Sequence, residues 1–229
     1  MTFWEHLDEL RAVIIRCMLV TALFACVAFC LREQLFHIIL LPKGNGLTLI
    51  NTSVTGQFVT HMTMSLYTGV LCALPYLLYQ IFGFISPALY TQERRLAVRL
   101  VVSGYVMFMV GAMFSFFVIF PITLQFLGTY QVSKEVSNLI SLDSYVDTLL
   151  TLTLLLGCVF ELPIVCWLLG RTGVLNRRLM RQYRRHAVVA ILVVAAIITP
   201  TSDAFTLMLV SVPIYLLYEC SIWLVRSGK

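Results

Sequence analysis

The acidic side chains are the main candidates for ligand binding or proton uptake in this chain. The 229 residues include eleven Asp and Glu residues in a sequence that is 60% hydrophobic and 12% charged. A carboxylate in such surroundings binds a cation or a proton, and it matches a guanidinium group with two parallel hydrogen bonds. The segment 79–95 is aromatic and stiffened by a proline, and near its end Glu93 is followed directly by Arg94 and Arg95. This segment is therefore a candidate for recognising a water-soluble partner.

The N-terminal segment 2–11 predicts an amphipathic helix that carries a second carboxylate. Phe3, Leu7 and Leu10 follow the i, i+4, i+7 spacing of one apolar face, and Glu9 lies on another face. Two interpretations stay open. The segment is either a solvated helix anchored at the membrane interface by its tryptophan, or it places Glu9 near a cationic ligand.

Glu161 stands inside a long apolar run, two residues before Pro163. An unpaired carboxylate inside a bilayer is costly in free energy, or it takes up a proton. Here too, two interpretations stay open. Glu161 either hydrogen-bonds backbone groups freed by Pro163 or another buried polar group, or it is a polar contact point that faces a concavity or a partner helix.

Two acidic residues near the C-terminus have structural interpretations. Asp203 precedes the last apolar run and is placed to cap the N-terminus of a helix there. Glu219 lies near the end of that run, and we expect it to pair with an arginine of segment 177–185. The wider segment 171–185 carries six arginines, which we expect to set the orientation in the membrane and to meet anionic lipid. Nucleic-acid binding is not expected, because the segment is a short loop beside the membrane without a nucleic-acid-binding fold.

Catalysis and metal binding find no support in the residue spacings. The sequence contains no HExxH, GxSxG or phosphate-binding glycine motif. The four histidines are scattered near the ends of apolar runs, and the seven cysteines form neither a CxxC pair nor a Cys/His ligand set. We therefore expect no enzyme activity, no cofactor and no metal.

The elements that position these residues are expected to be membrane-spanning helices. Soluble domains are roughly 45–50% apolar and about 25% charged, so this composition indicates an integral membrane protein. A bilayer core of about 30 Å takes roughly 20 apolar residues per helix. We predict an all-α fold, with a single membrane domain over residues 1–229 and six spans at approximately 12–31, 62–82, 96–127, 145–169, 186–199 and 205–225.

The fifth span is unusually short, and proline recurs in or near the spans. The apolar core of the fifth span, 187–198, has only twelve residues, which at 1.5 Å each gives about 18 Å. We therefore expect a locally thin region of bilayer near spans five and six. Proline removes a backbone donor and kinks a helix. Kinked helices and a curved rather than straight bundle are therefore expected from the prolines in or near the spans, which are Pro75, Pro121, Pro163, Pro200 and Pro213.

The distribution of basic residues predicts the orientation. Six spans place both termini on one side of the membrane. With the termini in the cytoplasm, thirteen Lys and Arg residues lie inside and three lie outside, namely Arg32, Lys43 and Lys134. Because basic residues favour the cytoplasmic side, both termini and segment 79–95 are predicted to be cytoplasmic.

An ordered set of short motifs runs along almost the whole chain. The groups are His6-Leu7-Asp8-Glu9-Leu10-Arg11, Tyr79-Gln80, Phe84, Pro87-Ala88-Leu89-Tyr90, Glu93-Arg94-Arg95, Phe160-Glu161-Leu162-Pro163, Thr199-Pro200, Asp203 and Leu217-Tyr218-Glu219. This set resembles the TatC family, whose members are the core membrane subunit of the twin-arginine protein translocase, and the first group is similar to the HLxELR start of that family. Thr201 and Ser202 separate a proline from Asp203, which departs from the family's usual TPPD or TPD.

The resemblance implies a kinked, glove-like bundle of six helices in which the fifth and sixth are short. It implies a multi-pass protein of the bacterial cytoplasmic (inner) membrane that receives signal peptides with consecutive arginines on folded cargo. The partners would be single-span TatA and TatB subunits, in a receptor complex that holds more than one copy of this chain. Transport would draw on the proton-motive force.

The resemblance also implies roles for particular residues. Glu93 and Phe84 would bind the signal peptide, with Glu9 and Arg11 nearby. Glu161 would be the intramembrane polar residue that contacts a partner. Pro42 would be the loop proline that precedes the periplasmic segment.

Two carboxylates suit a ligand with two arginines, because each can take one guanidinium and lysine does so less well. Glu9 and Glu93 supply the carboxylates, and Phe84 could cover the flanking peptide. An alternative from another class is a small-molecule or ion transporter that uses Glu161 as a proton-coupled site.

Overall fold

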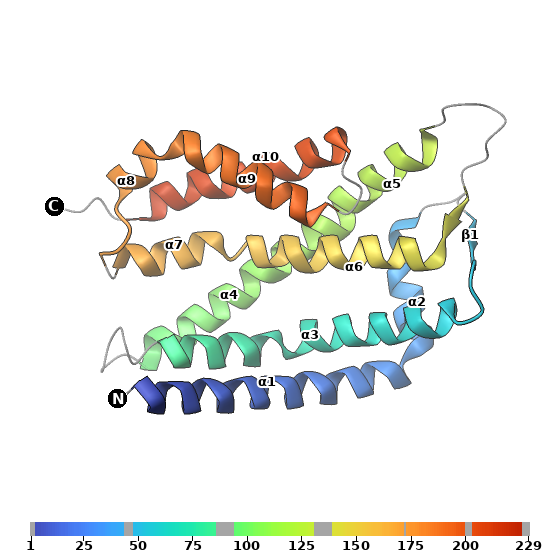
Figure 1. The fold of residues 1–229 in the computed structure, drawn as a ribbon, viewed down its shortest axis with the longest axis horizontal. Helices are drawn as coiled ribbons and strands as arrows, with labels where there is room; N and C mark the ends of the chain where they lie inside the picture. The colour runs from blue at the N-terminus through green and yellow to red at the C-terminus, as the bar shows by residue number, and fades with distance from the viewer. Residues whose placement is uncertain are drawn as a thin grey trace. The chain divides into compact units, whose positions relative to one another are not determined.

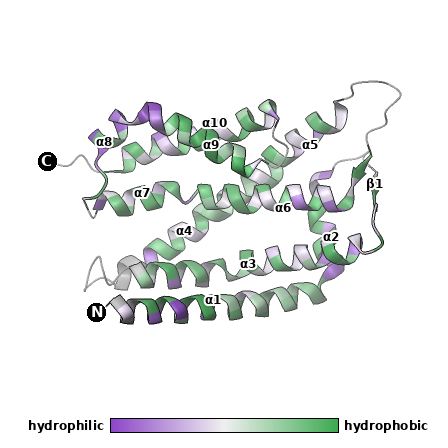
Figure 2. Ribbon diagram, in the orientation of Figure 1, coloured by the Kyte–Doolittle hydropathy of each residue, from purple (hydrophilic) through white to green (hydrophobic). Residues whose placement is uncertain are grey.

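The computed structural model describes residues 3–43, 48–85, 94–130, 139–171, 173–199 and 203–225, and these are mostly helical (Figure 1). Long apolar helices dominate, as Figure 2 shows, so the predicted all-α membrane fold is confirmed. The elements in chain order are α1 (Phe3–Cys30), α2 (Arg32–Ile39), η1 (Leu41–Lys43), β1 (Leu49–Ile50), α3 (Gly56–Ile85), α4 (Arg94–Phe114), a π-helical turn η3 (Ser115–Ile119), α5 (Phe120–Thr129), β2 (Ile140–Ser141), α6 (Leu142–Val159), α7 (Leu162–Arg171), α8 (Arg177–Gln182), α9 (Arg184–Ile198) and α10 (Ala204–Leu224).

Five helical segments in the described ranges are long and apolar enough to cross a membrane: α1, α3, α4 with α5, α6 with α7, and α10. The predicted fifth span is α9, whose fifteen residues cover about 22 Å. The 21 residues of α10 also make it shorter than α1, with 28, and α3, with 30. The short fifth and sixth helices of the prediction are therefore present.

Two helix irregularities are explained by proline. The helix α5 begins next to Pro121, and the preceding turn η3 widens so that the N–H of Phe120 donates to the carbonyl of Ser115, five residues earlier. In the fourth span, α6 ends at Val159 and α7 begins at Leu162, one residue before Pro163. Both irregularities lie beside a proline, whereas α3 and α10 continue through Pro75 and Pro213.

Contacts divide the chain into two compact units, and the division falls within α4 and α6. The first unit comprises Met1–Tyr105 with Ser137–Leu150, and the second comprises Val106–Val136 with Thr151–Lys229. Because two helices continue through the division, a single membrane domain remains a prediction.

In the first unit, α1 packs against α3 over much of its length (Figure 1). The helices approach so closely at Gly69 that a Cβ there would lie 2.8 Å from the Cβ of Ala25. Nearer the other end of the pair, the ring of Phe29 stacks on His61 at 4.3 Å between centroids. Small residues at the contact allow this approach, and packing rather than water exclusion holds helices together in lipid.

The connection after α2 is tied to the start of α6. The buried hydroxyl of Tyr145 donates to the carbonyl of Ile39 at 3.0 Å. The short strands β1 and β2 pair in parallel, with Leu49 opposite Ile140. These bonds satisfy backbone groups where the chain leaves its long helices.

In the second unit, α10 packs on α7, α8 and α9. A small apolar cluster at its C-terminal end contains Met180 of α8, Ile222 and Val225. At the N-terminal end of α10, the ring of Phe205 stacks on Phe126 of α5 at 4.1 Å between centroids. Both ends of α10 are thereby fixed to neighbouring helices.

Candidate functional site

The packing of α1 on α3 brings Glu9 and Arg11 to the same end of the helix pair as Phe84. The two helices are antiparallel, because Ala25 faces Gly69 while Phe29 faces a residue eight positions earlier in α3, His61. Glu9 lies sixteen residues before Ala25 in α1. The last residue of α3, Ile85, lies sixteen residues after Gly69. The N-terminal turns of α1 therefore lie level with the final turn of α3, which contains Phe84.

The side chains of Glu9, Arg11 and Phe84 differ in their exposure to solvent. Arg11 is exposed, whereas Glu9 and Phe84 are half-buried and both make contacts within the chain. Neighbouring Gly83 is exposed, and a Cβ built there meets no atom of the described residues within 4 Å. Among the described residues, the surface at Gly83 is therefore open.

Glu93 lies outside the described residues, as does the rest of segment 86–93, and so do the side chains of Arg94 and Arg95. Its position along the chain is nevertheless bounded. In the sequence, Glu93 immediately precedes Arg94, the first residue of α4, and lies eight positions after Ile85, the last residue of α3. Its role stays a prediction.

Glu161 sits in the break between α6 and α7. Its backbone carbonyl accepts hydrogen bonds from the N–H groups of Ile164 and Val165, both at 3.0 Å, and so starts α7. Both side-chain oxygens are buried, and neither has a hydrogen-bond partner among the described residues. The first interpretation of Glu161, a carboxylate that satisfies kinked backbone or another buried polar group, therefore finds no contact to support it.

Asp203 caps α10, as the sequence predicts. Its Oδ2 accepts a hydrogen bond from the N–H of Thr206 at 2.7 Å, and its own backbone is extended, as an N-cap requires. The arrangement satisfies one of the backbone donors at the start of the helix. Its structural interpretation is confirmed.

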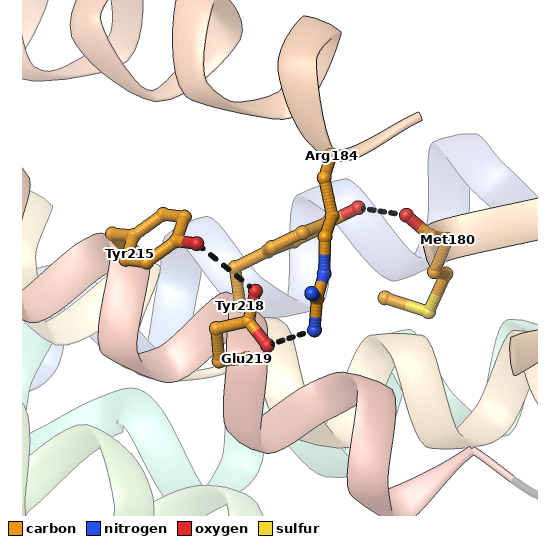
Figure 3. A network of polar contacts seen from close by, with 5 residues as sticks. All are labelled: Met180, Arg184, Tyr215, Tyr218 and Glu219. Atoms are coloured by element: carbon orange, nitrogen blue, oxygen red, sulfur yellow. Dashed lines mark hydrogen bonds and ion pairs between the residues drawn. The ribbon is translucent and has the colours of Figure 1, made fainter. Parts of the chain in front are cut away.

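Glu219 pairs with Arg184, the first residue of α9, which confirms the predicted pairing with segment 177–185. A guanidinium Nη2 of Arg184 lies 2.6 Å from Oε2 of Glu219 (Figure 3). The hydroxyl of Tyr215 donates to Oε1 of Glu219 at 3.1 Å. Beside them, the hydroxyl of Tyr218 donates to the carbonyl of Met180 at 2.8 Å. This polar network joins α10 to both α8 and α9.

Pro42 lies in the turn η1 that follows α2, where the N–H of Lys43 donates to the carbonyl of Leu40. Pro42 is the middle residue of this turn, three positions after the end of α2. In the described ranges, no group of three or more His, Cys, Asp or Glu side chains is placed to hold a metal ion.

Sequence reasoning missed two arginine–tryptophan contacts in the second unit. The guanidinium carbon of Arg177 lies 5.2 Å from the ring centroid of Trp223. The corresponding distance from Arg171 to Trp167 is 5.6 Å. The spacing of four residues between Trp167 and Arg171 on one helix could have indicated the second contact, but nothing in the sequence links position 177 to position 223.

Comparison with known proteins gives consistent results along the chain. The model of a family described as Sec-independent protein translocase protein (TatC) matches residues 5–213. The protein of that name from Desulforapulum autotrophicum is 34% identical over 224 residues, which cover 96% of this chain and 82% of the relative. The one from Aquifex aeolicus is 34% identical over 228 residues, which cover 98% of this chain and 94% of the relative.

Solved structures resemble the fold over the same length. A crystal structure of a twin arginine translocase receptor, TatC, in DDM superimposes with a TM-score of 0.87 at 33% identity, covering 96% of this chain and 99% of the other. A second crystal structure of such a receptor gives a TM-score of 0.85, also at 33% identity.

Proposed function

The chain belongs to the TatC family of Sec-independent protein translocase proteins, and on this premise we propose that it is the subunit that binds twin-arginine signal peptides. Membership of the family makes it a membrane protein of the twin-arginine translocase and not an enzyme. It also decides against the alternative of a solute transporter.

One observation carries the assignment of the binding site. The antiparallel register of α1 and α3 brings Glu9 and Arg11 level with Phe84, at the end of α3 that precedes Glu93 in the sequence by eight residues. In the proposed complex, Glu93 and Glu9 each accept one guanidinium of the signal peptide, which bidentate geometry favours over lysine. Phe84 and the open surface at Gly83 receive the flanking residues.

Arg11 has a different task in this proposal. A cation beside two carboxylates lowers the free energy of the site while no signal peptide is bound, because it partly compensates their mutual repulsion. Arg11 is exposed and can move away when the ligand arginines arrive.

The partner subunits are proposed to contact Glu161. An intramembrane carboxylate whose buried oxygens have no partner within the described chain suits a polar group on a single-span helix of TatA or TatB type. The receptor complex is proposed to contain several copies of this chain, in the bacterial inner membrane with both termini cytoplasmic. Folded cargo crosses at the expense of the proton-motive force.

Site-specific photo-crosslinking tests the proposal. A photoreactive residue replaces Phe84 or Glu93, and a third variant carries it at Val54, which is fully exposed in the segment before α3 that is predicted to lie on the opposite side of the membrane. Positions 84 and 93 are expected to label a twin-arginine precursor and to lose that labelling with a Lys-Lys precursor. Position 54 is expected to label neither. Equal labelling of both precursors, or labelling from position 54 alone, would reject the proposed site.

A further inference from the structure

Half of the arginines in the basic segment 171–185 are not paired with a carboxylate from the described part of the chain. The segment contains six arginines and no acidic residue. Glu219 pairs with Arg184, and two others, Arg171 and Arg177, lie over indole rings. The remaining three are exposed, and no carboxylate in the described ranges pairs with them: Arg178, Arg181 and Arg185.

These arginines are held on a fixed support. Met180, in the middle of α8, is 4% exposed and packs against Ile222 and Val225. Its carbonyl accepts the hydrogen bond from Tyr218, and the side chain of Asn176 caps the first turn of α8. The helix α8 is thus docked on the end of α10 by apolar packing and by a hydrogen bond.

The arginines of α8 share one side of it. Successive residues turn by about 100° around a helix, so Arg177, Arg178 and Arg181 fall within about 100° of one another. Leu179, Met180 and Gln182 occupy the rest of the circumference. Figure 2 shows the hydrophilic stretch at α8 next to the apolar lengths of α9 and α10.

Exposed apolar and aromatic side chains lie beside the arginines of α8. Trp223 is 73% exposed although Arg177 lies over its ring, and Tyr183 and Leu179 are about half exposed. Arginine beside exposed tryptophan, tyrosine and leucine is the composition of a surface at the boundary between lipid headgroups and acyl chains.

We propose that α8 and Trp223 form a binding site for an anionic phospholipid of the surrounding bilayer. Arg178 and Arg181 hold the headgroup phosphate, since guanidinium groups bind phosphate through two parallel hydrogen bonds. Trp223 lies at the level of the glycerol backbone, and Leu179 contacts the acyl chain. A twin-arginine peptide does not fit this site, because both carry the same charge. The assignment does not depend on the proposed function.

Quenching of Trp223 fluorescence by brominated lipids tests the site. The sequence has three tryptophans, so Trp4→Phe and Trp167→Phe leave Trp223 as the only one. The protein is reconstituted with brominated phosphatidylglycerol or with brominated phosphatidylcholine at equal mole fraction. The anionic lipid is expected to quench more strongly. That preference should fall by about fivefold for each arginine removed in Arg178→Gln and Arg181→Gln.

A matched control removes two exposed arginines elsewhere. Arg16→Gln with Arg32→Gln takes away the same charge from α1 and α2 and is expected to leave the preference unchanged. Equal quenching by both lipids, or a preference that survives in the Arg178→Gln, Arg181→Gln variant, would overturn the proposal. Loss of the preference on adding inorganic phosphate at constant ionic strength would overturn it in favour of a free phosphate ligand.

Discussion

The side-chain oxygens of Glu219 and Glu161, two carboxylates within apolar helical segments, differ in whether they have hydrogen-bond partners. Glu219 accepts bonds from Arg184 and Tyr215, whereas the buried oxygens of Glu161 have no partner in the described ranges. Desolvating a carboxylate without compensation costs free energy. A compensated residue such as Glu219 serves the fold, and we infer that an uncompensated one such as Glu161 is retained for a contact outside the chain.

Glu161→Gln removes the charge and keeps the shape. Because Glu161 has no side-chain hydrogen bond to lose among the described residues, the isolated protein is expected to unfold at the same or a higher SDS fraction in mixed micelles. Co-purification of the single-span subunits should fall at the same time, since glutamine is the weaker acceptor. If the variant is clearly less stable alone, Glu161 has a structural role instead.

The ion pair between Glu219 and Arg184 is expected to contribute modestly to the free energy of unfolding, because the side chain of Glu219 is 23% exposed and that of Arg184 is 45% exposed. A double-mutant cycle of Glu219→Ala and Arg184→Ala should give a coupling free energy of about 0.5–1 kcal/mol. Arg181→Ala in place of Arg184→Ala is the control and should show no coupling. Equal coupling free energies with both arginines would mean that the coupling comes from the overall positive charge of the segment and not from the 2.6 Å contact between Arg184 and Glu219.

At the scale of elements, the sequence predicted the presence of helices better than their pairing. Pro121 and Pro163 mark irregularities, because a missing N–H has a local consequence, but α3 and α10 continue through Pro75 and Pro213. The expected amphipathic segment 2–11 and the first span instead form one continuous helix, α1. The register of α1 against α3 depends on side chains 44 positions apart in sequence, Ala25 and Gly69, and no local pattern contains that information.

Gly69→Ala tests this register. The added Cβ would lie 2.7 Å from the backbone N of Ala25, so the helices must separate. We expect a loss of about 1–3 kcal/mol in the free energy of unfolding in SDS mixed micelles. Gly83→Ala is the control within α3, where the added Cβ meets nothing within 4 Å, and it should be neutral or stabilising by up to about 1 kcal/mol. Equal losses in both variants would contradict the assigned contact.

For the molecule as a whole, length and hydropathy predicted the membrane class, the helical fold and the short fifth helix, because a bilayer imposes a length on each span. The predicted cap at Asp203 and the pairing of Glu219 also proved correct. The contacts between β1 and β2, and between Tyr145 and Ile39, were not predicted. They join segments about a hundred residues apart, and their two-residue strands leave no periodic signal.

The orientation of the whole chain is testable by thiol labelling. In a cysteine-free background, Val54→Cys should react with a membrane-impermeant maleimide added to intact cells, because it is exposed in a segment predicted to be outside. Val174→Cys, which is also exposed, should react only after the cells are lysed. The reverse pattern would invert the predicted topology.

The central claim, that Glu93 accepts a signal-peptide arginine, is tested most directly by the dissociation constant of a twin-arginine peptide for the chain in lipid nanodiscs. Losing a charged hydrogen-bond partner in Glu93→Gln should raise this constant at least about tenfold. Replacing both peptide arginines by lysine should weaken binding to the unmodified chain as well. Glu33→Gln, at the start of α2, removes the same charge on the side predicted to be outside and should leave the constant unchanged. A dissociation constant that Glu93→Gln leaves unchanged, or equal binding of the lysine peptide, would contradict the account.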